Sequence, residues 1–204
     1  SIISQNKGAI MNFLFFILYC TVMTATPGPT NIMILSTVHN YGVKRALQFS
    51  FGSAFAFFLL LTLSVIFNSV LMTYLPKIVI VLQIVGAIYM LYLAYGIFRI
   101  SADSKEQESF SSFKSGFLLQ FINPKSVLFA LTVFPSFVLP YYQSTLSLLM
   151  FVLLISFICV LAFLSWVLFG KVLKGFLDRY STIVNNIMAG FLVLCAVMIS
   201  GIMG

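Results

Sequence analysis

The stretch Thr26-Pro27-Gly28-Pro29-Thr30-Asn31 interrupts an apolar run that would otherwise be long enough for one membrane-spanning helix. A second interruption, Ile122-Asn123-Pro124-Lys125-Ser126, lies inside another such run, and Pro27 and Pro124 are 97 residues apart. Proline cannot donate a backbone hydrogen bond inside a helix, so each helix is expected to stop and restart near the middle of its span. Because that distance is half of the chain counted from Met11, the breaks occupy matching positions in two equal halves.

The composition predicts an all-α integral membrane protein. Of the 204 residues, 61% are hydrophobic and only 7% are charged, and the mean hydropathy is +1.12. A soluble domain carries roughly a quarter charged residues and needs a polar shell, which excludes a soluble enzyme, a nucleic-acid-binding protein and a disordered protein. The basic residues behind the net charge of +7 are interpreted as contacts to lipid headgroups and as determinants of membrane topology. The expected partner is therefore the lipid bilayer and not nucleic acid.

Six transmembrane helices are predicted, because an apolar run of about 20 residues can span a bilayer once. They are expected at residues 11–37, 44–72, 76–99, 113–138, 144–171 and 181–203, with the first and the fourth interrupted. These runs lack the polar–apolar alternation of a transmembrane barrel. The predicted organisation is an extension at 1–10, a three-helix repeat at 11–100, a linker loop at 101–112 and a second repeat at 113–204. Three spans in each half make the second repeat inverted relative to the first.

The distribution of basic residues predicts the orientation. Eight Lys and Arg residues lie in the loops after the first, third and fifth helices, whereas Lys7 and Lys77 lie on the opposite side. Loops rich in Lys and Arg face the cytoplasm, so both termini are predicted on the outer side. A cleaved signal peptide is a rival interpretation of the first helix, but its removal would leave five helices and destroy the symmetry.

The two breaks carry capping residues as well as prolines. Asn123 before Pro124 is the pattern of an N-cap followed by proline at the first helical position, and Thr26 before Pro27 has the same pattern. Free backbone N–H groups at each new helix start, with the positive end of the helix dipole, would form an anion site. Matching breaks in inverted halves indicate a central transport site, and a pair of packing kinks is the alternative interpretation.

Lys125 is the only charged residue that these spans place deep in the membrane. A charge at that depth is costly and marks a functional site by default. All four acidic residues lie in predicted cytoplasmic loops, so a substrate carboxylate is a natural partner for Lys125. The alternative is that the side chain snorkels to an interface, although roughly twelve residues of helix lie on either side of it.

At these residues the chain resembles the LysE family of bacterial amino-acid exporters. The resemblance rests on the 26–31 motif, on Gln120-Phe121-Ile122-Asn123-Pro124-Lys125, and on the run at 86–94, and it covers the chain from Met11. Residues 137–140 and 193–199 resemble the sequences of the family branch that exports cysteine and O-acetylserine. The resemblance implies a multi-pass protein of the bacterial cytoplasmic membrane that exports small amino acids, powered by the membrane potential or by a proton gradient.

The predicted function is a secondary transporter, not an enzyme, which exports small neutral amino acids or their derivatives by alternating access and needs no cofactor or metal. The absence of an acidic residue in the spans disfavours lysine or arginine as cargo and carboxylate-mediated proton coupling. Alternating exposure would come from rocking of the two halves around the breaks. The predicted substrate-binding residues are Thr26, Pro27, Gly28, Pro29, Thr30, Asn31, Gln120, Asn123, Pro124, Lys125 and Ser126.

Other functions of similar build stay open at this point. A membrane thiol oxidoreductase would need paired cysteines, whereas Cys20, Cys159 and Cys195 are interpreted as inert buried thiols. An intramembrane hydrolase would need buried carboxylates or a Ser/His pair, and the single His39 is predicted to be a solvated loop residue. A passive channel would share the broken helices. The sequence leaves open the amino acid exported, the coupling ion and whether the protein is a homo-oligomer.

Overall fold

The computed structural model describes residues 2–99 and 111–200, and every regular element in these ranges is a helix. The predicted linker at 101–112 and the predicted end of the last helix at 203 lie largely outside the described residues. The elements are α1 (Ile2–Ala25), α2 (Pro29–Tyr41), α3 (Val43–Phe98), α4 (Phe113–Ile122), α5 (Pro124–Val133), π-helix η3 (Phe134–Val138), α6 (Thr145–Val172), α7 (Lys174–Arg179) and α8 (Ser181–Ile199).

The helices account for six membrane spans. Four segments are long and apolar enough to cross a membrane alone: Val43–Asn68, Lys77–Phe98, Thr145–Val172 and Ser181–Ile199. Two further spans arise if each bent helix pair counts as one, namely Phe13–Ala25 with Pro29–Tyr41, bent by 49°, and Phe113–Ile122 with Pro124–Val138, bent by 63°. Each half therefore has a broken span followed by two long ones, which confirms the predicted all-α fold with interrupted first and fourth spans.

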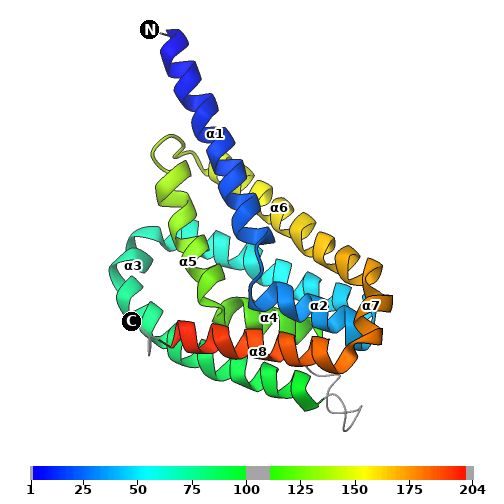
Figure 1. The fold of residues 1–204 in the computed structure, drawn as a ribbon. Helices are drawn as coiled ribbons and strands as arrows, with labels where there is room; N and C mark the ends of the chain where they lie inside the picture. Colours follow the sequence, from blue (N-terminus) through cyan, green and yellow to red (C-terminus); the bar gives the residue numbers. More distant parts are fainter. Residues whose placement is uncertain (1, 100–110, 201–204) are drawn as a thin grey trace.

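The second and third predicted spans form one continuous element, α3, instead of two separate helices. Within this described helix, the departure from helical geometry is at Phe67, with φ −109° and ψ 20°, where the helix kinks. The chain stays helical between the spans Val43–Asn68 and Lys77–Phe98, so it turns through a kink and not through a loop. Figure 1 shows α3 turning at one end of the bundle before its second half returns along α8.

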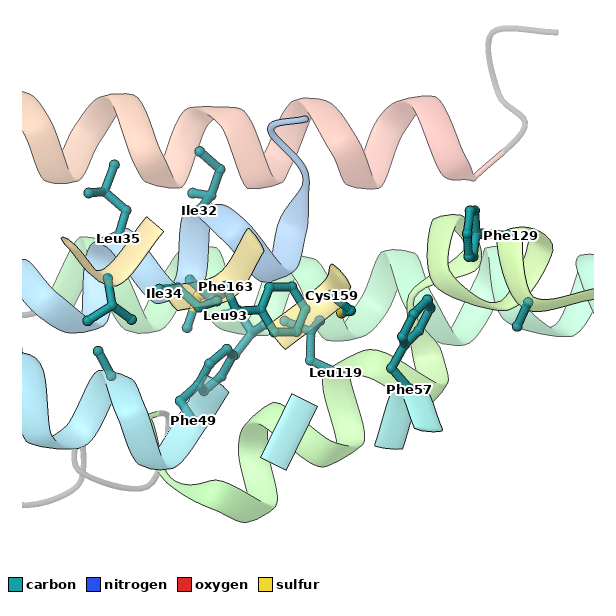
Figure 2. Close-up of a cluster of buried hydrophobic side chains, with 14 of the residues drawn as sticks. Ile32, Ile34, Leu35, Phe49, Phe57, Leu93, Leu119, Phe129, Cys159 and Phe163 are labelled. Atoms are coloured by element: carbon teal, nitrogen blue, oxygen red, sulfur yellow. The ribbon is translucent and has the colours of Figure 1, made fainter. Parts of the chain in front are cut away.

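The first broken span places its second half inside the bundle. Residues 29–39 of α2 are all buried, and α2 contacts α3, α6 and α8. In contrast, the N-terminal part of α1 projects beyond the other helices (Figure 1). Figure 2 shows part of the buried apolar cluster in which α2 takes part, including Ile32, Ile34 and Leu35. The residues at the start of α2 are thus held at the centre of the protein.

The helices α3 and α4 touch through their backbones. A Cβ atom on Gly116 would overlap the carbonyl oxygen of Phe49, and one on Gly52 would overlap the carbonyl oxygen of Phe113. The Ser53 hydroxyl donates a hydrogen bond of 3.0 Å to the carbonyl oxygen of Gly116 across the same contact. Small residues at a helix interface permit this close approach of two backbones. The contact fixes α4, and with it the second helix break.

Candidate functional site

The second break has the predicted structure. Asn123 lies between α4 and α5 as the N-cap, and Pro124 occupies the first turn of α5. The Asn123 side-chain oxygen accepts a hydrogen bond of 3.1 Å from the backbone N–H of Lys125. The sequence pattern of a capping residue before proline therefore predicted this helix start correctly.

The first break differs from its predicted pattern. The N-cap of α2 is Gly28, in an extended conformation with φ −162° and ψ 176°, and Pro29 follows in the first turn. Thr26 does not cap this helix, because its hydroxyl donates back to the carbonyl oxygen of Val22 at 2.7 Å. The prediction that Thr26 and Pro27 start the second helix is wrong, and Pro29 is the structural counterpart of Pro124.

The two helix starts therefore differ in whether their backbone N–H groups have hydrogen-bond acceptors. At α5, the backbone N–H groups of Lys125, Ser126 and Val127 all donate to Asn123. At α2, the first backbone hydrogen bond runs from the N–H of Ile32 to the carbonyl oxygen of Gly28. Within the described residues, the backbone N–H groups of Thr30 and Asn31 have no acceptor. The geometry expected of an anion site at both breaks therefore occurs at the start of α2 alone, where free N–H groups coincide with the positive helix end.

Hydrogen bonds join the two breaks directly. The Thr30 hydroxyl donates to the Gln120 side-chain oxygen at 2.9 Å, and the Asn123 amide donates to the Thr30 hydroxyl at 3.3 Å. The Lys125 ammonium group donates to the carbonyl oxygen of Thr26 at 3.1 Å and to the hydroxyl of the same residue at 3.0 Å. Residues 90 to 99 positions apart in the sequence therefore meet at one place.

A pocket lies at this junction, with an empty volume of about 370 Å³ including its mouth. Seven of the eleven predicted residues line it: Gly28, Thr30, Asn31, Gln120, Asn123, Lys125 and Ser126. Thr26, Pro27, Pro29 and Pro124 shape the breaks without lining the pocket. Sequence reasoning missed the remaining lining residues, which are Met23, Thr24, Phe57, Phe129, Cys159 and Phe163.

The pocket combines one cation with one unused acceptor. Lys125, half-buried, is the only charged side chain that lines it. Asn31 is 3% exposed, and its amide nitrogen donates to the carbonyl oxygens of Thr24 at 2.9 Å and Thr26 at 2.8 Å. Its side-chain oxygen is buried and has no hydrogen-bond partner. A buried polar atom without a partner is costly, so this oxygen is suited to a donor that comes from outside the chain.

Two residues outside the pocket make contacts that the sequence did not predict. His39 was predicted to be solvated but is 6% exposed, with Nδ1 3.2 Å from the Asp178 carboxylate and Nε2 3.2 Å from the Ser181 hydroxyl. The prediction is wrong because α2 continues past His39 and packs against α7 and α8. Trp166 lies at the first break, where its indole N–H donates to the carbonyl oxygen of Ala25 at 2.9 Å. That bond satisfies one of the free carbonyls at the end of α1.

Six spans, two of them broken around a polar pocket, define a membrane transport protein. Residues 21–200 match the family described as LysE type translocator, and the chain belongs to this family. It is thus a multi-pass translocator of the bacterial inner membrane.

Several curated proteins are similar along nearly their whole length. The chain is 32% identical over 189 residues to a cysteine/O-acetylserine efflux protein of Klebsiella pneumoniae, which covers 90% of this chain and 94% of that protein. Proteins of the same name from Salmonella paratyphi A and from Escherichia coli K12 are 31% and 30% identical, each covering 89% of this chain and 93% of the relative. No solved structure matches.

Proposed function

We propose that this chain is a secondary transporter, and not an enzyme, that exports small neutral amino acids or their derivatives from the cytoplasm. Membership of a translocator family and similarity to proteins named for cysteine and O-acetylserine efflux support an amino-acid cargo. The observation that carries the proposal is the pairing in one pocket of the Lys125 cation with the unpartnered side-chain oxygen of Asn31. These groups complement the two charges that every zwitterionic amino acid presents.

In the proposed binding mode, the substrate carboxylate lies against the start of α2. The Thr30 and Asn31 N–H groups and the positive end of the helix would stabilise it. Lys125 now donates to a neutral carbonyl and a neutral hydroxyl of Thr26, and a carboxylate is a stronger acceptor for an ammonium group than either. The substrate ammonium group would donate to the side-chain oxygen of Asn31. Gln120, Asn123 and Ser126 would complete the polar surface.

A neutral side chain is proposed because the pocket has no negative charge for a cationic one. No Asp or Glu lines it, and among the described residues the only acidic one is Asp178, which pairs with Lys174 at 3.2 Å. A lysine or arginine substrate would bring a second cation near Lys125 with nothing to neutralise it. Such an unpaired charge is costly in an apolar surrounding.

Alternating access is the proposed mechanism. Each half of the chain contributes one break, and the bonds Thr30–Gln120 and Lys125–Thr26 run between the halves. Rocking of one half against the other would therefore break and remake contacts at the pocket itself. A passive channel is the competing function, and it would equilibrate a substrate without accumulating it. The predicted orientation places the loops after the first, third and fifth spans in the cytoplasm, so export runs from that side.

The test is transport by the purified protein in proteoliposomes. Radiolabelled cysteine, O-acetylserine, alanine and lysine are supplied with and without an imposed pH gradient or membrane potential. We expect gradient-driven accumulation of the neutral amino acids above the level in protein-free liposomes, and no accumulation of lysine. Equilibration without accumulation under every gradient would favour the channel. Failure to move any neutral amino acid would overturn the proposal.

Removal of the Asn31 side-chain acceptor is expected to weaken recognition of the substrate ammonium group. In the wild-type protein, alanine should inhibit transport much better than propionate, which is alanine without its ammonium group. In Asn31→Ala this advantage should fall about tenfold, because a hydrogen bond to a charged group contributes about 1.5–3 kcal/mol. The measurement is the ratio of inhibition constants for the two ligands in both proteins, which cancels any general damage to the pocket. An unchanged ratio would show that the ammonium group lies elsewhere.

A further inference from the structure

The pocket has an apolar wall in addition to the polar groups of the two breaks. It is formed by Phe57 of α3, Phe129 of α5, and Cys159 and Phe163 of α6, all of them buried. Cys159 and Phe163 are four residues apart, so they lie on one face of α6. Figure 2 shows these four side chains within the apolar cluster. A substrate whose carboxylate and ammonium groups bind at the breaks would direct its side chain toward this wall.

Aromatic contacts hold two of the four wall residues in place. The ring of Phe57 stacks on that of Phe129 with centroids 5.6 Å apart, and Phe129 stacks on Tyr19 at 5.5 Å. Tyr19 in turn stacks on Phe137 at 5.0 Å, outside the pocket. Aromatic pairs of this kind add stability beyond the apolar area they bury. Because Tyr19 and Phe137 pack against this stack, its rings cannot move easily to admit a longer substrate side chain.

Cys159 is the smallest side chain in this wall. It is 1% exposed, and it is not part of the aromatic stack. A change in its volume would therefore alter the depth of the pocket without disturbing Phe57 or Phe129. That the pocket binds a ligand at all is supported independently by Asn31, whose buried side-chain oxygen lines the same pocket without a partner.

We propose that Cys159 determines the longest substrate side chain that the transporter accepts, and that the apolar wall restricts the cargo to amino acids with short, uncharged side chains. This inference rests on the proposed function and adds the residue, Cys159, that selects substrates by the length of their side chain. A rigid apolar pocket discriminates one methylene group by about 10- to 200-fold, so replacement of a single wall residue can shift the preference measurably.

The experiment uses a series of amino acids with linear side chains of increasing length: alanine, 2-aminobutyrate, norvaline and norleucine. Transport of each is measured in proteoliposomes as the ratio of its specificity constant to that of alanine. Cys159→Ala is expected to raise the norvaline and norleucine ratios about tenfold, because it removes one heavy atom from the wall. Cys159→Leu is expected to lower the 2-aminobutyrate and norvaline ratios by about the same factor.

Two controls separate length selection from general effects on α6. Cys159→Ser keeps nearly the same volume and should leave the length profile unchanged. Leu161→Ala shortens an exposed side chain of α6 that does not line the pocket, and should also leave the profile unchanged. If Cys159→Leu does not fold, Cys159→Ala alone decides the question.

The outcomes distinguish this inference from the proposed function. A length profile that is the same in wild type and Cys159→Ala, with alanine still transported, would overturn the role of Cys159 and leave amino-acid export intact. A profile that shifts equally in Leu161→Ala would overturn it as well. A wild-type protein that transports no amino acid would instead refute the proposed function.

Discussion

Lys125→Ala is expected to lower the rate of neutral amino-acid transport by about 100-fold while the protein still folds and inserts. Lys125 is the only cation lining the pocket, and a substrate carboxylate would lose its charged donor. A hydrogen bond to a charged group contributes about 1.5–3 kcal/mol, and each 1.4 kcal/mol corresponds to about a tenfold change. The expected loss corresponds to the upper end of this range because no other charged side chain lines the pocket to take the place of Lys125.

Two companion variants test whether the charge itself matters. Lys125→Arg keeps a cation at the break and should retain more transport than Lys125→Ala. Lys171→Ala removes an exposed lysine at the end of α6, far along the chain from both breaks, and should transport at the wild-type rate. Initial rates are compared in proteoliposomes at equal protein content. Normal transport by Lys125→Ala would overturn the binding mode proposed for the carboxylate.

A structural role for Lys125 must be separated from a role in binding. Its ammonium group also links the two breaks through the carbonyl and the hydroxyl of Thr26. Thr26→Val removes one of these acceptors and leaves the charge in place. It should reduce transport by less than about tenfold, because the bond to the hydroxyl is exposed and the carbonyl acceptor remains. A loss as large as that of Lys125→Ala would indicate that the shape of the break, and not the cation, limits transport.

The spans and the positions of both breaks could be predicted because they depend on local sequence. Apolar runs near 20 residues long and proline within them act at short range. Asn123 could be assigned as an N-cap because its neighbour Pro124 fixes where the helix begins. The cap of α2 could not, because the Thr26 hydroxyl can bond either the preceding or the following turn. It bonds the preceding carbonyl of Val22, which leaves Gly28 as the N-cap.

The apolar wall could not be found from the sequence. A Phe or Cys in a membrane helix can face lipid, other helices or a pocket, and no local pattern separates these environments. Phe57, Cys159 and Phe163 line the pocket only because α3 and α6 pack beside the breaks. His39 was misplaced for a similar reason, since its partners Asp178 and Ser181 are about 140 positions away in the sequence. Tertiary contacts of this range lie outside the reach of periodicity and composition.

Gly116→Leu is expected to prevent accumulation of folded protein, and Gly116→Ala to lower its thermal stability. A Cβ atom on Gly116 would overlap the carbonyl oxygen of Phe49 and lie 2.8 Å from the hydroxyl oxygen of Ser53. The first of these atoms belongs to the backbone of α3, which cannot rotate away as a flexible side chain could. Overpacking a tight contact costs about 1–3 kcal/mol and sometimes more, and leucine adds three further carbon atoms at the same point.

Gly190→Ala provides the matched control, because it makes the same chemical change in a helix interior without a steric cost. Nothing lies within 4 Å of the position that a Cβ atom on Gly190 would occupy, and alanine favours a helix by about 0.8–1.0 kcal/mol over glycine. The midpoint of thermal unfolding in detergent should therefore rise or stay constant in Gly190→Ala and fall in Gly116→Ala. Equal midpoints would contradict the backbone contact between α3 and α4.

Since α4 carries Gln120 and ends at Asn123, a displaced α4 would also move two residues of the pocket. Gly116→Ala should consequently lose transport at temperatures where the protein is still folded, whereas Gly190→Ala should keep it.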